Sequence, residues 1–291
     1  MKKLKLTNPE ISDVSFKISR FPDGQQTIDI DPRDRDDNNS VRIDARLNNF
    51  KDLELIICAN QALRGVGFKD IHLFTPYFLG ARSDRKFQDG GINYLKQVIC
   101  PIINSQEFSS VLVMDPHSDV LEACLDNFKK VDNHILVKYA LSQIDNKNGA
   151  QDRICLVSPD AGAYKKIFDI AAKFQIENII TATKVRDLKT GNIIRTEIPL
   201  LEQHKDLKYV IVDDICDGGR TFLELAKVIK TQHPSAEVYL VVTHGIFTNG
   251  LLGLSKWIDR IFTTNSFGDA SAEEISEYTV GNSYLDKFGV I

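Results

Sequence analysis

The chain has 291 residues, of which 43% are hydrophobic, and a formal net charge of −4 at neutral pH. This length is long for one domain and comfortable for two, and the acidic balance argues against general nucleic-acid binding. No apolar run reaches the ~18 residues of a membrane span, and the first residues lack the apolar core of a signal peptide. The five cysteines are scattered without a Cys-x-x-Cys pair. They predict reduced thiols in a cytoplasmic protein.

Strands and helices alternate along the first half. Residues 14–30 alternate well enough for two strands around a turn at 21–24, and the charged run 31–40 is most simply a solvated loop. Further strands are expected at 41–45, 71–75 and 111–114, with helices at 50–64 and about 93–104. A helix within 133–147 is expected to carry the chain into its second half.

The second half continues the alternation. Strands are expected at 154–157, 179–183, 210–212, 238–243 and 261–264, and helices at 164–174 and about 222–229. Helices that alternate with short apolar strands favour parallel, doubly wound α/β sheets.

The segment 210–229 carries the most informative pattern. A short apolar strand ends in two carboxylates, Asp213 and Asp214, and a turn of small residues at 217–221 leads into an amphipathic helix. The turn therefore lies at the carboxyl end of a strand, where open α/β sheets bind ligands.

The residue types in this turn suit a phosphorylated ribose. Gly218 and Gly219 let backbone N–H groups approach an anion, Thr221 adds a hydroxyl, and the helix N-terminus adds a favourable dipole. The two aspartates would repel phosphate and suit sugar hydroxyls or a metal ion. The plain alternative is a polar loop that only caps the next helix.

Five segments in order resemble ribose-phosphate diphosphokinase, also called phosphoribosyl pyrophosphate synthetase, over about residues 16–264. They are Arg20-Phe-Pro-Asp-Gly24, Pro76-Tyr-Phe-Leu-Gly-Ala-Arg-Ser-Asp-Arg-Lys86, Val113-Met-Asp-Pro-His117, Val157-Ser-Pro-Asp-Ala-Gly162 and Val212-Asp-Asp-Ile-Cys-Asp-Gly-Gly-Arg-Thr221. The resemblance implies two domains of the type I phosphoribosyltransferase kind. We expect an ATP-binding domain at 1–138 and a ribose-phosphate-binding domain at 139–291.

The family transfers the β,γ-diphosphoryl group of ATP to the anomeric hydroxyl of ribose 5-phosphate, giving phosphoribosyl pyrophosphate and AMP. The resemblance implies Mg²⁺ as cofactor, with His117 and Asp160 as its ligands and His117 among the catalytic residues. Mg²⁺ usually takes one or two carboxylates together with substrate phosphates and water, so the residue types are suitable. A histidine satisfied by neighbouring backbone is the alternative for His117.

The resemblance also assigns the nucleotide side. The residues implied in ATP binding are Phe21, Asp23, Gln25, Arg82, Ser83 and Asp84. In the family, the loop that Phe21 matches reaches the adenine of a neighbouring subunit, which implies a homo-oligomer. Phe21 could equally be a core residue, and the basic loop around Arg82 could be solvated charge.

Lys184 and Arg186 match the family's mobile catalytic loop, whose basic residues would close over the transferred group. Without the family they would look like ordinary surface charge. The run 187–191 that follows is expected to be a flexible turn of this lid.

Several positions depart from the family's pattern. Gln25 stands where the family usually has glutamate and Ser83 where it has glutamine, and the glycine turn 217–221 differs from the usual Asp-Thr-small-Gly-Thr. The opening strand and helix look shortened to the few residues before Phe16.

The resemblance implies that the acceptor is held by Asp213, Asp214, Asp217, Gly218, Gly219, Arg220 and Thr221. Because Gly218 removes a side chain and Arg220 adds a charge, a 5-substituted ribose such as ADP-ribose, as in NAD salvage, is a second candidate acceptor. A catalytically silent regulatory homologue and a phosphoribosyltransferase are the remaining alternatives.

Overall fold

The computed structural model describes residues 1–35, 39–144, 153–186, 193–200, 206–269 and 279–280, with side chains undescribed at 184–186, 193–195 and 279–280. The chain forms two compact units, Met1–Asp132 (unit 1) and Asn133–Ile291 (unit 2). The sequence placed the boundary after residue 138. The division falls before helix α4 (His134–Ile144) because that helix contacts strands β13 and β14 of unit 2. Among the described residues, no helix has the length and apolar character needed to cross a membrane.

Unit 1 is built on a parallel sheet with the strand order β1-β4-β5-β6-β7, and β2 and β3 form a separate antiparallel hairpin. Its elements are β1 (Lys2–Lys5), η1 (Pro9–Ile11), β2 (Phe16–Arg20), β3 (Gln26–Ile30), η2 (Pro32–Asp34), β4 (Ser40–Asp44), α1 (Phe50–Gly65), β5 (Asp70–Thr75), η3 (Leu95–Ile99), α2 (Cys100–Asn104), β6 (Ser110–Met114), α3 (Val120–Cys124) and β7 (Phe128–Val131).

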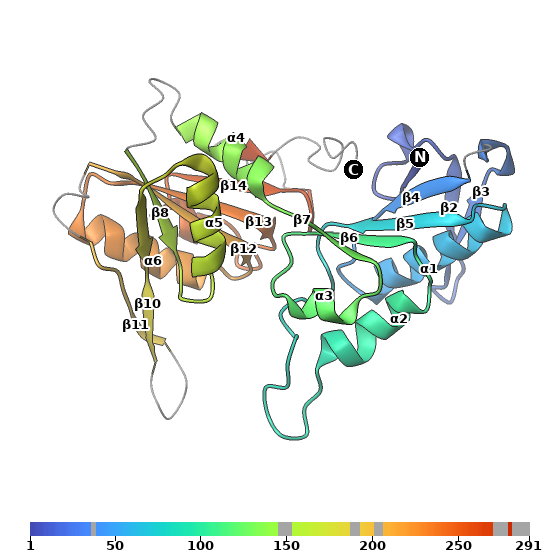
Figure 1. The fold of residues 1–291 in the computed structure, drawn as a ribbon, viewed down its shortest axis with the longest axis horizontal. Coiled ribbons are helices and arrows are strands. Elements are labelled where there is room, and N and C mark those ends of the chain that lie inside the picture. The colour runs from blue at the N-terminus through green and yellow to red at the C-terminus, as the bar shows by residue number, and fades with distance from the viewer. Residues whose placement is uncertain (36–38, 145–152, 187–192, 201–205, 270–278, 281–291) are drawn as a thin grey trace. The chain divides into compact units, whose positions relative to one another are not determined.

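One face of the unit 1 sheet carries the core. Helices α1, α2 and α3 lie on the same face of this sheet (Figure 1). Helix α1 begins where the Asn49 side chain accepts hydrogen bonds from the backbone N–H groups of Lys51 and Asp52, which is a favourable N-cap. Its apolar positions, among them Leu53 and Ile56, then recur at helical spacing and are fully buried.

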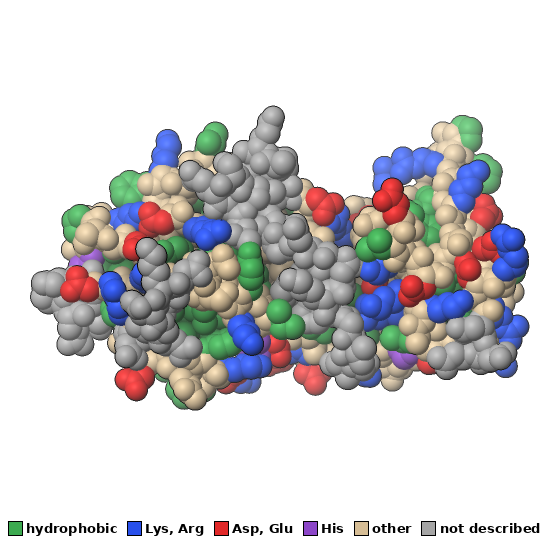
Figure 2. Space-filling view, turned by 90° about the horizontal axis from the view of Figure 1, so that it is seen from above, with side chains coloured by type: hydrophobic (Ala, Val, Ile, Leu, Met, Phe, Trp, Pro, Cys, Tyr) green, Lys and Arg blue, Asp and Glu red, His purple; other side chains and the backbone are tan. Residues whose placement is uncertain are grey.

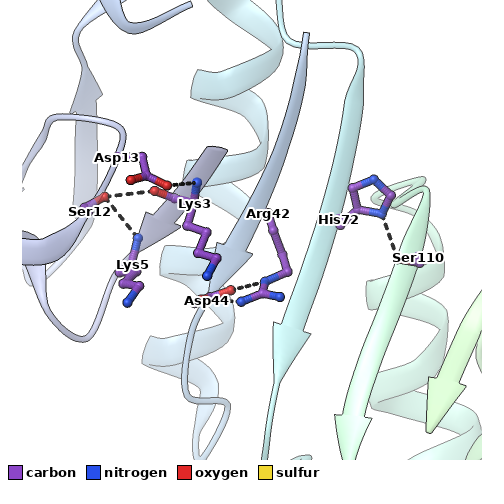
Figure 3. Close-up of polar contacts among 8 residues, drawn as sticks. All are labelled: Lys3, Lys5, Ser12, Asp13, Arg42, Asp44, His72 and Ser110. Carbon is purple, nitrogen blue, oxygen red and sulfur yellow. Dashed lines mark hydrogen bonds and ion pairs between the residues drawn. The ribbon is translucent and has the colours of Figure 1, made fainter. Parts of the chain in front are cut away.

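Polar groups lie on the other face of this sheet, as Figure 3 shows. The Arg42 guanidinium is paired with Asp44 (Nη2 to Oδ2, 2.8 Å) and lies over the Phe74 ring, although Arg42 is only 4% exposed. On the neighbouring strands His72 Nδ1 lies 2.7 Å from Ser110 Oγ. On the part of unit 1 seen at the right of Figure 2, acidic and basic side chains are interspersed.

Unit 2 has a parallel sheet with the strand order β15-β14-β13-β12-β8-β9, and β10 and β11 form an antiparallel hairpin. Besides α4, its elements are β8 (Ile154–Ser158), α5 (Tyr164–Phe174), β9 (Asn178–Thr181), β10 (Thr183–Arg186), β11 (Ile193–Glu197), β12 (Lys208–Cys216), α6 (Arg220–Gln232), β13 (Glu237–Gly245), α7 (Leu252–Ser255), β14 (Arg260–Thr264) and β15 (Thr279–Val280).

The strand order of unit 2 reverses between β8 and β12. The chain runs outward from β8 to β9, returns to β12 on the other side of β8, and continues to β13 and β14. In doubly wound sheets the crevice at such a reversal, outside the carboxyl ends of the strands, is where ligands bind. The reversal therefore places the loops after β8 and β12 side by side.

The parallel α/β architecture expected from the sequence is confirmed, with several differences in detail. Strands β1, β7, β11 and β15 and helices α3 and α7 were not expected, because each is short and lacks a strong apolar run. Strand β12 continues to Cys216, so both aspartates lie within the strand instead of after it. Lys184 and Arg186 lie in strand β10 instead of in a loop, and the expected flexible turn falls outside the described residues.

Candidate active site

Two adjacent carboxylates lie at the carboxyl end of β12. The strand pairs with β13 as far as Cys216 and Gly245, so the backbone around Asp213 and Asp214 is fixed by the sheet. Asp214 is 5% exposed, Asp213 is half-buried, and the Asp213 carboxylate accepts a hydrogen bond from the Asp214 N–H (2.9 Å). Burial raises the pKa of Asp213 well above its ordinary value, and the neighbouring Asp214 raises it further.

A lysine outside the expected site accompanies this pair. Lys166 Nζ lies 3.8 Å from Asp214 Oδ1, and its charge opposes the rise in the pKa of Asp213. Lys166 stands in the first turn of α5, where a cation is unfavourable for the helix dipole. Contact with the aspartates explains that placement. Lys166 was not predicted from the sequence, because nothing marks it locally except that it is a lysine in a first helical turn, where an acidic residue is preferred.

The turn 217–221, called the glycine loop below, connects β12 to α6. Gly219 is the N-cap residue of α6 and has φ = +74°, a conformation that glycine adopts without strain. Leu223 N–H donates to Gly219 O (3.0 Å), and Gly219 has no side chain with which to cap the helix. The first N–H groups of α6 are therefore not used within the helix or by its cap residue, an arrangement that suits an anion. Arg220 is exposed at the first position of α6.

A second loop, residues 246–250, braces the glycine loop. Ile246 and Phe247 N–H both donate to Cys216 O (2.8 and 3.1 Å). Thr248 Oγ1 donates to Asp217 Oδ1 (2.7 Å), and Asn249 Nδ2 donates to Gly218 O (3.1 Å). The room left by the missing side chain of Gly218 is filled by Asn249, because a Cβ there would lie 2.8 Å from Asn249 Nδ2.

Asp160 lies in the loop after β8, beside β12 in the sheet. Its Oδ1 accepts hydrogen bonds from the N–H groups of Gly162 (3.0 Å) and Ala163 (3.2 Å), and Ser158 Oγ donates to its carbonyl (2.7 Å). One carboxylate oxygen thus helps to shape the turn that leads into α5. Because β8 and β12 are neighbouring parallel strands, Asp160, the two aspartates of β12 and the glycine loop share one edge of the unit 2 sheet.

In unit 1 the expected site residues follow the adjacent strands β5 and β6. His117 is exposed two residues after Asp115, which is buried and has φ = +42°, an uncommon conformation for a non-glycine residue. Arg82 is exposed in the loop after β5, and Ser83 and Asp84 are half-buried beside it. Asn93 Nδ2 donates to Asp84 O (2.6 Å) and ties this loop to the start of the next helix.

The remaining expected residues of unit 1 lie on the β2–β3 hairpin. Phe21 is 52% exposed, so it is not a core residue, and Asp23 and Gln25 are exposed as well. Phe21 N–H donates to Gln25 O, and Asp23 Oδ1 accepts from Gln25 N–H (3.1 Å), which closes the turn expected at 21–24. Gln26 anchors the hairpin to α1 through Nε2, which donates to Lys51 O (2.7 Å) and Glu54 Oε2 (3.1 Å).

The residue types expected to bind Mg²⁺ suit an ion that arrives bound to the phosphates of a substrate. No group of three or more histidine, cysteine or acidic residues that could hold a metal is found within the described ranges. The expected pair for Mg²⁺ consists of an exposed imidazole, His117, and the half-buried carboxylate of Asp160. One or two protein ligands, completed by phosphates and water, is the usual arrangement for Mg²⁺ at nucleotide sites. The carboxylate of Asp160 therefore fits such an ion, and the imidazole of His117 fits a contact with the phosphates that carry it.

Comparisons with known proteins agree with this architecture. Residues 129–267 match a family model described as the phosphoribosyl transferase domain. A ribose-phosphate pyrophosphokinase of Marinomonas sp. (strain MWYL1) is 26% identical over 232 residues, which cover 79% of this chain and 71% of that protein. The enzyme of the same name from Mycoplasma genitalium is 26% identical over 279 residues, or 93% of this chain and 80% of that protein. The crystal structure of phosphoribosylpyrophosphate synthetase from Mycobacterium smegmatis has the same fold, with a TM-score of 0.74 at 15% identity over 94% of this chain and 87% of that chain.

Proposed function

We propose that the chain, which is similar to ribose-phosphate pyrophosphokinases, transfers the β,γ-diphosphoryl group of ATP to the anomeric hydroxyl of ribose 5-phosphate. The products are phosphoribosyl pyrophosphate and AMP. The oxygen of the anomeric hydroxyl forms a bond to the β-phosphorus, the bond between that phosphorus and the oxygen of AMP breaks, and the hydroxyl proton is released.

The observation that carries the proposal is the pairing of acidic strand and glycine loop at the reversal point of the unit 2 sheet. Asp213 and Asp214 offer acceptors to the hydroxyls of a ribose, and they stand directly before a loop whose N–H groups suit a phosphate. A ribose with a 5-phosphate presents both features. Lys166 limits the repulsion within the aspartate pair before a substrate arrives.

The nucleotide side of the proposal rests on residues of unit 1 and on the hairpin of unit 2. Arg82, Ser83 and Asp84 would contact ATP, together with Phe21, Asp23 and Gln25 of the β2–β3 hairpin. Lys184 and Arg186 of β10 would stabilise the charge on the transferred group. Phosphoryl transfer depends mainly on positioning and electrostatic stabilisation, so a strand-borne pair of cations is suited to this role.

His117 and Asp160 would hold Mg²⁺ against the ATP phosphates. Bound there, the ion would neutralise negative charge that develops on the phosphate oxygens. His117 is exposed and can orient phosphate oxygens through a ring N–H, while Asp160 already has one oxygen fixed by two backbone N–H groups.

The proposal also covers the cellular location and the oligomeric state of the enzyme. All five cysteines are free, and burial raises the pKa of Cys155 and of Cys216 to about 12, so these thiols stay protonated. This suits a cytoplasmic enzyme. An exposed phenylalanine at the tip of the β2–β3 hairpin suits a contact with a second copy of the chain, and we expect a homo-oligomer.

ADP-ribose is a second candidate acceptor, favoured by the exposed Arg220 at the start of α6. A cation there could contact a second phosphate. The argument from Gly218 is weaker than the sequence indicated, because Asn249 occupies the space that the glycine leaves. We therefore place ribose 5-phosphate first.

One experiment separates these possibilities. The purified chain is incubated with ATP, Mg²⁺ and equal amounts of ribose 5-phosphate and ADP-ribose, and products are identified by mass spectrometry and ³¹P NMR. Phosphoribosyl pyrophosphate and AMP are expected. Diphosphorylated ADP-ribose as the main product would reassign the acceptor. No transfer to either acceptor would contradict the proposal and favour a regulatory homologue.

A further inference from the structure

We propose that Asn249 is the positioning residue that orients the phosphate-binding peptide of the glycine loop, the peptide between Gly218 and Gly219. The inference rests on the proposed function, since it concerns the binding of the acceptor's 5-phosphate. It concerns a residue 31 positions away from that loop, on the loop that follows a different strand.

The side-chain amide of Asn249 contacts Gly218 at two of its atoms. Asn249 Nδ2 donates to Gly218 O at 3.1 Å and lies 2.8 Å from the position that a Cβ on Gly218 would take. The side-chain amide therefore lies both against the α-carbon of Gly218 and within hydrogen-bond distance of its carbonyl oxygen. A side chain at residue 218 would displace it.

Because the peptide is planar, this contact also fixes the direction of the Gly219 N–H. In a trans peptide the C=O and the following N–H point in opposite directions. While Asn249 holds Gly218 O, the N–H of Gly219 must point away from Asn249, in the opposite direction within the peptide plane. Gly219 is the N-cap residue of α6, so its N–H belongs to the donors that would meet a phosphate.

Without this contact the peptide would be free to rotate. It is flanked by glycines on both sides, which have the widest range of backbone dihedral angles. A rotated peptide would point its carbonyl oxygen at the phosphate and repel it. The neighbouring Thr248 acts in the same sense, because its hydroxyl holds Asp217 Oδ1 at 2.7 Å and fixes the direction of a carboxylate that would otherwise be able to approach the anion.

The test compares Asn249→Leu with the unmodified chain. Leucine keeps a side chain of similar size and removes the donor, and residue 249 is exposed, so folding should be retained. Loss of one hydrogen bond that orients a ligand-binding group should raise KM for ribose 5-phosphate roughly tenfold. KM for ATP and the melting temperature should remain unchanged. If Asn249 had only a structural role, Asn249→Leu would lower the melting temperature and would change KM for both substrates alike. Leu252→Ala is the matched control, because Leu252 is 84% exposed just after the same loop and should change none of these values.

A double variant separates orientation from space filling. In Asn249→Ala with Gly218→Ala, the new Cβ occupies the volume that the amide vacates, but no donor is restored. KM for ribose 5-phosphate should stay as high as in Asn249→Ala alone. Recovery of the original KM would overturn the inference and leave Asn249 as a space-filling residue.

Failure of the inference can be told apart from failure of the proposed function. If the unmodified chain is active and Asn249→Leu keeps KM for ribose 5-phosphate within about twofold, a difference smaller than a hydrogen bond is worth, the positioning role is wrong. If the unmodified chain shows no transfer, the proposed function is wrong, and calorimetric binding of ribose 5-phosphate to both proteins decides the positioning role. Weaker binding by Asn249→Leu supports it, and equal or absent binding overturns it.

Discussion

Lys166 of α5 lies 3.8 Å from Asp214 of β12, at the carboxyl edge of the unit 2 sheet. The lysine thus brings a positive charge to the adjacent aspartates. Both groups are largely shielded, with 23% of the lysine side chain and 8% of the aspartate side chain exposed, so the interaction is less screened than one at the surface.

Replacing Lys166 by methionine should move the acid limb of the pH–activity profile to higher pH. The lysine lowers the pKa of Asp213, so its removal leaves that carboxyl group protonated over a wider pH range, in which it is a weaker acceptor for a ribose hydroxyl. The profile of kcat/KM for the acceptor measures the shift. Lys165→Met, one position earlier on an exposed part of the same helix, is the control and should leave the profile in place.

Asp213→Asn should stabilise unit 2 and abolish acceptor binding. The folded pKa of Asp213 lies above its unfolded value, so its contribution to stability is complete below the unfolded pKa and is lost as pH rises through the folded pKa. Above that pH the variant avoids a buried charge beside Asp214. Its melting temperature should exceed that of the unmodified chain by roughly 2–4 °C for each kcal/mol of repulsion removed. Thermal unfolding from acidic to neutral pH checks this, and a difference that shrinks as pH rises would contradict it.

Lys184→Ala combined with Arg186→Ala should lower turnover by roughly two to three orders of magnitude, because fixed charges that stabilise a transition state carry effects of that size. ATP binding should be retained, since the nucleotide is expected to contact unit 1. Steady-state kinetics and titration with a nucleotide analogue measure the two quantities. Near-normal turnover would contradict a catalytic role for Lys184 and Arg186.

Gly219→Ala should destabilise the glycine loop by about 1–2 kcal/mol, the usual cost of a left-handed conformation for an L-residue. The φ of +74° is unfavourable for alanine, and its Cβ would lie 3.0 Å from Leu254 Cδ1. Chemical denaturation gives the free energy of unfolding. Gly253→Ala provides the comparison, because no atom lies within 4 Å of its Cβ position and it lies within helix α7. It should be neutral or slightly stabilising.

The sequence predicted the parts of the fold that depend on local pattern. Helix α5 was placed at 164–174 as found, and the turn around Phe21 closes where the local residue types put it. The roles of His117 and Asp160 follow from the resemblance alone and stay predictions.

What the sequence did not predict comes from contacts between distant segments. Lys166 and Asp214 are 48 positions apart, and Asn249 and Gly218 are 31 apart. Neither Lys166 nor Asn249 belongs to a motif, and each gains its role only when neighbouring parallel strands bring the loops together. The end of β12 was misplaced for a related reason, because pairing with β13 overrides the low strand preference of aspartate.

The packing of Asn249 against Gly218 also has an evolutionary consequence. The two positions share one small volume, so neither can enlarge unless the other shrinks. Related enzymes with a side chain at the position of Gly218 should therefore carry a smaller residue at the position of Asn249. The two positions are therefore expected to covary. The shape of the glycine loop would then depend on substitutions in both loops.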